Sequence, residues 1–167
     1  MSGRIDESRS FQPVRIAVMT VSDTRGEAED TSGRTLAELI KRDGHELVDR
    51  AIVKDDVAAI TAKLRSWVAD PGIEVVISTG GTGVTGRDVT PEAFESLFEK
   101  KIDGFGELFR SLSYDEIGPA AMLSRAVAGV AAGRIVASLP GSTAAVELAI
   151  GKLLLPELGH MVALLGR

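Results

Sequence analysis

The sequence contains no cysteine, which excludes disulfides, thiolate metal sites and cysteine nucleophiles. Its two histidines, His45 and His160, are too few to predict a histidine-based metal site. Aromatic residues make up only 4% of the chain, so stacking platforms for single-stranded nucleic acid are not available in number. Because the net charge is also −5, we expect no nucleic-acid partner.

Long hydrophobic runs are missing as well. No apolar stretch approaches the length of a membrane span, and the N-terminus is polar and charged, unlike a signal peptide. We therefore expect a cytoplasmic protein with no membrane partner. The chain has 167 residues, which is enough for one domain. We expect a flexible polar tail over residues 1–13 and a single domain over 14–167.

Strand-like and helical patterns alternate along the chain. The strands are expected at about 15–21, 46–53, 73–78, 126–131 and 134–139. The helices are expected through Leu36 and Ile40, through Ile60 and Leu64, from Pro91 through Phe98, at 104–113 and 120–125, from Ser142 to about Leu155, and from Pro156 onward. This order predicts a three-layer α/β/α sandwich with a mostly parallel sheet and a small antiparallel hairpin over 126–139.

A glycine-rich loop over residues 79–92 follows the strand at 73–78. Its four glycines let backbone N–H groups turn inward and approach a ligand closely, as in an anion-binding site. Arg87 adds a cation and Asp88 a carboxylate, and we expect Thr90 to cap the next helix with Pro91 at its first position. From the loop alone, a phosphate or nucleotide site and a simple tight turn are equally open.

Polar residues also follow the other expected strands, at 22–24, 55–56 and 140–142. Ligands of parallel α/β sheets bind at the carboxyl ends of the strands, so this convergence favours a nucleotide-like site. Simpler roles stay open for several of these residues. Asp56 is expected to cap its helix, residues 22–24 are equally consistent with a polar turn, and Asp88 has the alternative of ordering its own loop.

Five short motifs stand in order along the chain: STGGTG at 78–83, RDVTPEA at 87–93, GFGE at 104–107, LSRA at 123–126 and LPGS at 139–142. Together they resemble the MoaB/MogA family of molybdenum cofactor biosynthesis, and the run at 108–118 resembles its MoaB branch. The resemblance implies the family's molybdopterin-binding α/β fold and a homo-oligomer, a trimer or a dimer of trimers. It also implies adenylyl transfer from Mg-ATP to molybdopterin, giving adenylyl-molybdopterin and pyrophosphate, with other molybdenum cofactor biosynthesis proteins as further partners.

The resemblance also implies which residues act. Asp55 and Asp88 match the two family aspartates that position Mg²⁺ and are needed for transfer, so they are the expected catalytic and metal-binding residues. The expected nucleotide-binding residues are Thr79, Gly80, Gly81, Thr82, Gly83, Leu139, Pro140, Gly141 and Ser142. The expected substrate-binding residues are Ser22, Asp23, Thr24, Ser113 and Arg125, with a solvated charge as the alternative for Arg125.

Two other functions stay open at this point. One is a non-catalytic carrier or assembly subunit that binds molybdopterin and releases no pyrophosphate. The other is molybdate insertion, which we rank last because the chain has the length of the core domain only. The leucine-rich stretch over 153–165 exceeds one amphipathic stripe, so we expect it to contact another subunit, or else to be buried beneath the sheet.

Overall fold

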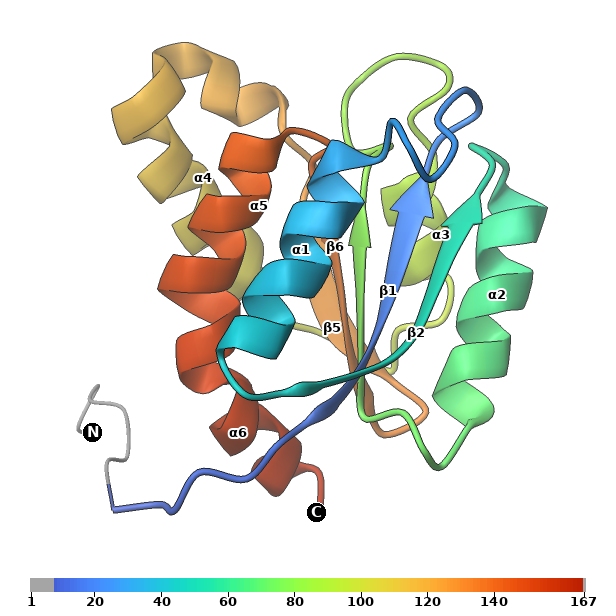
Figure 1. Ribbon diagram of the computed structural model, residues 1–167. Coiled ribbons are helices and arrows are strands. Elements are labelled where there is room, and N and C mark those ends of the chain that lie inside the picture. Colours follow the sequence, from blue (N-terminus) through green and yellow to red (C-terminus); the bar gives the residue numbers. More distant parts are fainter. Residues whose placement is uncertain (1–7, 167) are drawn as a thin grey trace.

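The computed structural model describes residues 8–166 (Figure 1). Its elements are β1 (Arg15–Val21), α1 (Thr31–Arg42), β2 (Glu46–Val53), α2 (Val57–Ala69), β3 (Val75–Thr79), α3 (Thr90–Glu95), β4 (Lys100–Lys101), α4 (Asp103–Ile117), the 3-10 helix η1 (Gly118–Leu123), β5 (Val127–Ala131), β6 (Arg134–Leu139), α5 (Thr143–Ala149), the π-helical turn η2 (Ile150–Leu154) and α6 (Leu155–Leu164). Residues 8–13 form no helix or strand, and residues 1–7 of the expected tail lie outside the described residues. The flexibility of that tail stays a prediction.

The six strands form one mixed sheet in the order β2-β1-β3-β6-β5-β4. The neighbours β2, β1, β3 and β6 are parallel, and β5 runs antiparallel between β6 and β4. The β5–β6 pair is the expected hairpin, and it turns at Ala132 and Gly133, which both have positive φ. Because four strands are parallel, the segments after β1, β2, β3 and β6 all leave the sheet at one edge, the upper edge in Figure 1.

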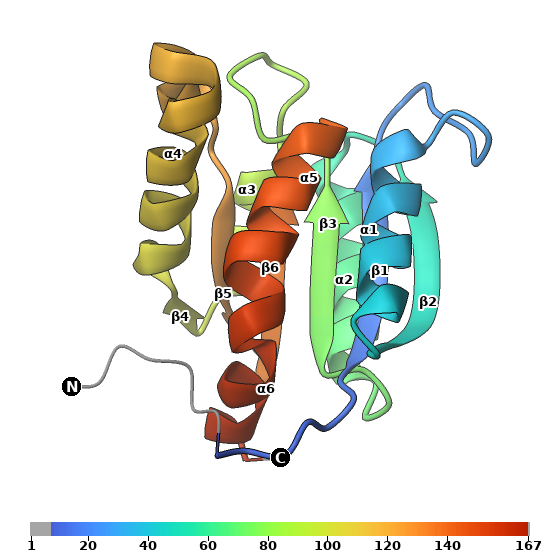
Figure 2. The same cartoon turned by 60° about the vertical axis from the view of Figure 1, so that its left-hand side comes forward.

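Helices cover both faces of the sheet, which confirms the three-layer sandwich (Figures 1 and 2). On one face, α1, α4, α5 and α6 bury residues such as Ile40, Phe109 and Leu158 against the strands. On the other face, α2 and α3 bury Trp67 and Phe94. In β1, β3 and β6 successive side chains enter opposite cores, which explains why these strands are mostly apolar, whereas the edge strand β2 carries charged residues and is exposed or half-buried.

A buried carboxylate anchors the start of α1. The Asp30 side chain is fully buried and accepts hydrogen bonds from the Gly33 amide (3.0 Å), the Thr20 hydroxyl (2.7 Å) and Arg50 Nη2 (2.7 Å). Burial alone would raise the pKa of Asp30, but the bonds from Arg50, Thr20 and Gly33 outweigh it and lower the pKa below its ordinary value. Asp30 therefore fixes the far end of the loop that follows β1.

The N-caps of two helices agree with the expectation from the sequence, and the N-cap of a third does not. Asp56 and Ser142 cap α2 and α5, as expected, by accepting from the amides of Ala59 and Ala145. The expected cap at Thr90 is wrong, because the N-cap of α3 is Val89 and Thr90 is the first helical residue. Thr90 is fully buried with its hydroxyl beside Gly81, and this hydroxyl has no hydrogen-bond partner among the described residues.

Several boundaries also differ from expectation, and the strand expected at 73–78 is found at Val75–Thr79. Helix α3 ends at Glu95, before Leu97 and Phe98, which still pack against the α2 side of the sheet. The helix expected at 104–113 is longer, running from Asp103 to Ile117, and a 3-10 helix follows it directly. The two C-terminal helices are joined by the π-helical turn η2 without a break at Pro156. The two-residue strand β4 was not expected, because a strand that short leaves no periodic pattern.

The C-terminal leucine-rich stretch packs mainly within the chain. Leu154, Leu158 and Val162 are buried in the core beneath the sheet, and Leu164 and Leu165 are exposed. Leu153, Leu155 and Met161 are partly buried and pack against the same core, so most of the apolar residues of this stretch are used within the chain. Among the described residues, no helix is long and apolar enough to span a membrane.

Candidate functional site

Two aspartates from neighbouring strand ends hold each other through their backbones. The Asp23 amide donates to Asp55 Oδ2 (3.0 Å), and the Asp55 amide donates to Asp23 Oδ1 (2.9 Å). Asp23 Oδ2 accepts from Arg87 Nη2 (3.0 Å), which reaches across from the glycine loop. Three loops of the carboxyl edge, those after β1, β2 and β3, are therefore joined through Asp23.

The two carboxylates differ in their electrostatics. The hydrogen bond from Arg87, with the Asp55 amide, holds the pKa of Asp23 below its ordinary value. Desolvation raises the pKa of Asp55, and the negative charge of Asp23 raises it further. The second Asp55 oxygen, Oδ1, points at Gly81, and it lies 3.2 Å from the position that a Cβ on Gly81 would take. Asp55 therefore presents a partly desolvated carboxylate to the glycine loop.

The first glycines of the loop are required by geometry. Gly80 and Gly81 have φ of 103° and 71°, which L side chains rarely adopt. A Cβ on Gly80 would lie 2.4 Å from the Val21 carbonyl oxygen, and one on Gly81 would lie 2.2 Å from Thr90 Oγ1. The loop can therefore leave β3 at this place only because both residues lack a side chain.

Other nucleotide-binding candidates join the loop to the end of β6. The Thr79 hydroxyl donates to the Pro140 carbonyl oxygen (2.9 Å), and the Gly80 amide donates to the Leu139 carbonyl oxygen (2.9 Å). Gly141 lies against Gly80, since a Cβ on Gly141 would be 3.4 Å from Gly80 Cα. The structure therefore brings the segments 79–83 and 139–142 together, as the sequence predicts for one site.

Asp88 orders the tip of the glycine loop. Its Oδ2 accepts from both the amide (2.9 Å) and the hydroxyl (2.7 Å) of Thr85. Burial alone would raise the pKa of Asp88, but the bonds from Thr85 and from the Gly83 amide lower it below its ordinary value. The loop-ordering alternative for Asp88 is therefore present in the structure. The Thr-x-x-Asp spacing is similar to that of a capping box, in which an acidic side chain reaches back three residues to the amide of a serine or threonine.

The expected substrate-binding residues are placed less uniformly. Ser22 Oγ accepts from the amides of Thr24 (3.3 Å) and Arg25 (3.1 Å), which is the polar turn left open as an alternative. Ser113 is buried on α4 and belongs to none of the strand-end loops. The guanidinium of Arg125 is bonded to acceptors of the glycine loop and of α3. Binding of substrate by these residues stays a prediction.

No cluster of three or more histidine, aspartate or glutamate side chains able to hold a metal occurs within residues 8–166. Asp55, which follows β2, and Asp88, within the glycine loop, are two carboxylates that suit a hard cation. Mg²⁺ is commonly held by one or two carboxylates together with substrate phosphates and water, so this donor set fits Mg²⁺ that arrives with a triphosphate.

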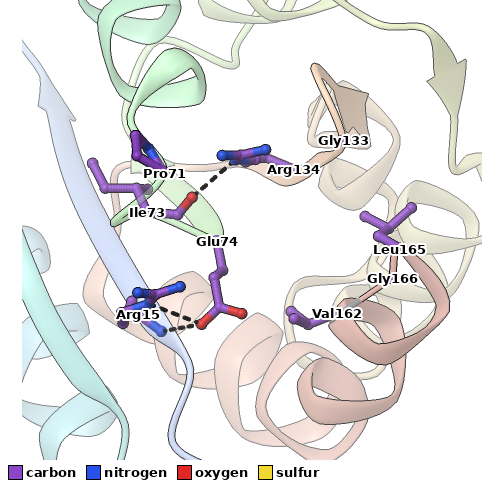
Figure 3. Close-up of a pocket in the computed structure, with 9 residues that line it drawn as sticks. All are labelled: Arg15, Pro71, Ile73, Glu74, Gly133, Arg134, Val162, Leu165 and Gly166. Atoms are coloured by element: carbon purple, nitrogen blue, oxygen red, sulfur yellow. Dashed lines mark hydrogen bonds and ion pairs between the residues drawn. The ribbon is translucent and has the colours of Figure 1, made fainter.

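Two hollows lie away from the strand-end loops. One, of about 210 Å³, lies at the opposite edge of the sheet and is lined by residues such as Arg15, Glu74 and Arg134 (Figure 3). The other, of about 560 Å³, lies on α4 and η1 between residues such as Tyr114 and Met122. Neither hollow contains the glycines and aspartates that converge at the carboxyl edge, so neither changes the choice of site.

The fold and the site together define a class of protein. A parallel α/β sheet carries, at its carboxyl edge, a glycine loop, two carboxylates from separate loops and a second glycine-containing turn. This arrangement is typical of α/β proteins that bind phosphorylated ligands at the ends of their strands.

Comparison with known proteins assigns the family. A family model described as "Probable molybdopterin binding domain" matches residues 17–160. The chain is 49% identical over 162 residues to molybdenum cofactor biosynthesis protein B of Bacillus cereus, with 96% of both chains covered. It is 47% identical over 151 residues to the protein of that name from Escherichia coli K12, with 90% of this chain and 89% of the other covered. A crystal structure of a molybdenum cofactor biosynthesis protein B has a TM-score of 0.91 at 48% identity, with 94% of this chain and 98% of the other covered.

The chain belongs to the MoaB/MogA family of molybdenum cofactor biosynthesis proteins, in its MoaB-like branch. The resemblance that the five sequence motifs suggested is thereby confirmed, and so is the fold that it implied.

Proposed function

We propose that this chain transfers the adenylyl group of ATP to molybdopterin. The supporting observation is the Asp55 carboxylate, which accepts a hydrogen bond from the Asp23 amide and is partly desolvated. Its other oxygen faces Gly81 at the start of the glycine loop. Family membership supports molybdopterin as the substrate. A carboxylate with a raised pKa costs the fold stability when ionised, and a group perturbed in this way at a convergence of loops is a candidate for a functional site.

The reaction balances without any change of oxidation state. An oxygen of the terminal phosphate of molybdopterin attacks the α-phosphorus of ATP, a new P–O bond forms, and the bond to the bridging oxygen of the β-phosphate breaks. Pyrophosphate leaves with the electron pair. Because the nucleophile is already anionic, the protein has to align the two phosphates and offset their charge.

The hydrogen bonds of the loop narrow down which groups bind phosphate. The amide of Gly80 is used on Leu139 and that of Gly83 on Asp88, so we assign phosphate oxygens to the amides of Gly81 and Thr82. Arg87 is an exposed cation, paired with Asp23 across the loops, and it can exchange this partner for a ligand phosphate.

Asp55 and Asp88 are proposed to hold Mg²⁺, which supplies positive charge to the triphosphate when bound. The two residues do this from different positions: Asp55 is fixed through the Asp23 amide, and Asp88 through Thr85. Thr79 bonds to Pro140, and Gly141 lies against Gly80. We therefore propose that these three residues act by supporting the start of the glycine loop.

The direct test is pyrophosphate release from Mg-ATP with freshly prepared molybdopterin. We expect release by the native chain and a loss of about 10²-fold or more in Asp55→Asn and in Asp88→Asn, as for other preorganised electrostatic groups. Asp56→Asn is the matched control, because Asp56 is adjacent to Asp55, caps α2, and is replaced by a residue that caps equally well. Full activity in Asp55→Asn contradicts the assignment, and molybdopterin binding without pyrophosphate release supports the carrier function instead.

We also propose that the chain associates with copies of itself, as the family resemblance implies. The support is the number of large apolar side chains on α4 and η1 that are at least half exposed, namely Leu108, Tyr114, Ile117, Met122 and Leu123. Two of them, Tyr114 and Met122, line the larger of the two hollows, and the surface around that hollow is called the α4–η1 face. Large exposed apolar patches on a small domain commonly mark protein interfaces.

A further inference from the structure

Arg125 makes more contacts with the glycine loop than a substrate-binding residue needs. We propose that Arg125 is a positioning residue, which fixes the conformation of residues 82–89 and thereby the place of Asp88. The importance of this for catalysis rests on the proposed adenylyl transfer, but the effect on the loop does not.

The contacts of Arg125 close the loop at its base. Its amide donates to the Thr82 carbonyl oxygen (2.9 Å), its Nε to the Gly83 carbonyl oxygen (2.7 Å), and its Nη2 to the Asp88 carbonyl oxygen (2.7 Å). Gly83 and Asp88 are the two ends of the exposed tip over 84–87. One planar guanidinium therefore ties both ends of that tip to the link between η1 and β5.

The remaining nitrogen, Nη1, pairs with the Glu92 carboxylate in the first turn of α3. The hydrogen bond from Arg125 holds the pKa of Glu92 below its ordinary value, so Glu92 stays ionised as a fixed counter-charge. Arginine suits this position because the N–H groups of its rigid, planar guanidinium point in three directions, one toward each acceptor. The single ammonium of lysine cannot reach three acceptors that are spread in this way.

Arg125 is itself held in place from α4. Arg110 Nη1 donates to the carbonyl oxygens of Ser124 (3.2 Å) and Ala126 (3.1 Å), the residues on either side of Arg125. The absence of a side chain at Gly106 gives the Arg110 guanidinium its space, since a Cβ there would lie 2.5 Å from Arg110 Nη2. A continuous set of hydrogen bonds therefore runs from α4 through Arg125 to the glycine loop.

The consequence is that Asp88 has two supports. Thr85 holds its side chain, and Arg125 holds its backbone carbonyl. Without Arg125 the turn closed by Thr85 can persist, but it loses its fixed position relative to Asp55 and the end of β6. Loss of the hydrogen bonds from the charged guanidinium should raise the equilibrium constant for local opening of the loop roughly tenfold or more.

The test compares Arg125→Lys and Arg125→Met with the native chain by hydrogen exchange of the backbone amides at 82–89. The lysine variant keeps a cation next to Glu92, so it separates lost geometry from lost charge. Arg134→Met is the matched control, because Arg134 also donates to three backbone carbonyls, those of Ile73 (3.0 Å), Ala132 (3.1 Å) and Asp70 (3.3 Å). Arg134 is the first residue of β6, so it lies at the opposite edge of the sheet, and it lines the hollow drawn in Figure 3.

We expect both Arg125 variants to exchange their 82–89 amides roughly tenfold faster or more, while β1 and β3 stay protected and Arg134→Met leaves the loop unchanged. Pyrophosphate release should then need a higher Mg²⁺ concentration for half-maximal rate in Arg125→Lys. Loop exchange at the native rate in Arg125→Lys overturns the proposal, and so does faster exchange with native Mg²⁺ dependence and rate. If the native chain releases no pyrophosphate but its loop loosens in both variants, the positioning role stands and adenylyl transfer is refuted.

Discussion

Replacement of Gly80 by alanine tests the geometry on which the whole site depends. A Cβ at this position would lie 2.4 Å from the Val21 carbonyl oxygen, about 0.6 Å inside the closest approach that real Cβ atoms show, with φ fixed at 103°. A left-handed conformation costs a non-glycine residue about 1–2 kcal/mol, and forced strain in a well-packed region costs a further ~1–3 kcal/mol. We therefore expect a loss of about 2–5 kcal/mol, a large share of the total stability of a domain.

The partner of the clash cannot easily move. Val21 ends β1, and β1 is paired on both sides, with β2 and with β3. At about 2–4 °C per kcal/mol for a chain of this size, Gly80→Ala should lower the midpoint of thermal unfolding by roughly 4–20 °C, measured by circular dichroism. Gly86→Ala is the control in the same loop, because a Cβ there meets no atom within 4 Å, and its midpoint should match the native one. A midpoint for Gly80→Ala that equals that of Gly86→Ala would refute the reasoning.

Two further predictions concern charge and assembly. The raised pKa of Asp55 means that its ionised form is disfavoured in the folded state, which lowers the free energy of unfolding. This loss of stability is fully present above the folded pKa and disappears as the pH falls below the ordinary value of 3.8. Asp55→Asn should therefore be more stable than the native chain at pH 7, with the gain vanishing near pH 3.8, and a less stable variant at pH 7 contradicts this. For the α4–η1 face, sedimentation should show a native mass above that of the monomer and a smaller mass for Met122→Lys, whereas a monomeric native chain rules out self-association.

Most of the fold was predictable because buried parallel strands leave a strong signal. The runs at 15–21 and 134–139 are mostly apolar and are bounded by turn residues, so the expected strand bounds agree with the structure there. The short strand β4 was not predictable, since its two lysines pair with β5 only through the chain's long-range arrangement. The π-helical turn η2 was missed for the related reason that it depends on packing rather than on a local pattern.

The sequence also predicted which segments come together at the site, but it did not predict which residues form hydrogen bonds there. Strand ends of a parallel sheet meet at one edge, so Asp23, Asp55 and the glycine loop had to approach one another. The pairing of Arg125 with Gly83 and Asp88 joins residues about 40 positions apart, and no spacing in the sequence encodes it. Arg110 is the exception, because it stands four residues after Gly106 on α4, and this spacing places a cation over a position without a side chain on the same helix face.

The family resemblance gives Asp55 and Asp88 the same role, but the two side chains make different hydrogen bonds. Their variants therefore have to be interpreted differently. Asp88 uses Oδ2 on Thr85, so Asp88→Asn removes a charge and also weakens a turn. Asp55 uses Oδ2 on one amide that an asparagine oxygen can equally accept, so Asp55→Asn removes mainly the charge of a desolvated group. Activity lost in Asp88→Asn alone would therefore indicate loop order, whereas activity lost in Asp55→Asn, in a chain that has become more stable, would indicate that the charge itself is required. The Asp55 variant is for this reason the stronger test of a metal at this edge of the sheet.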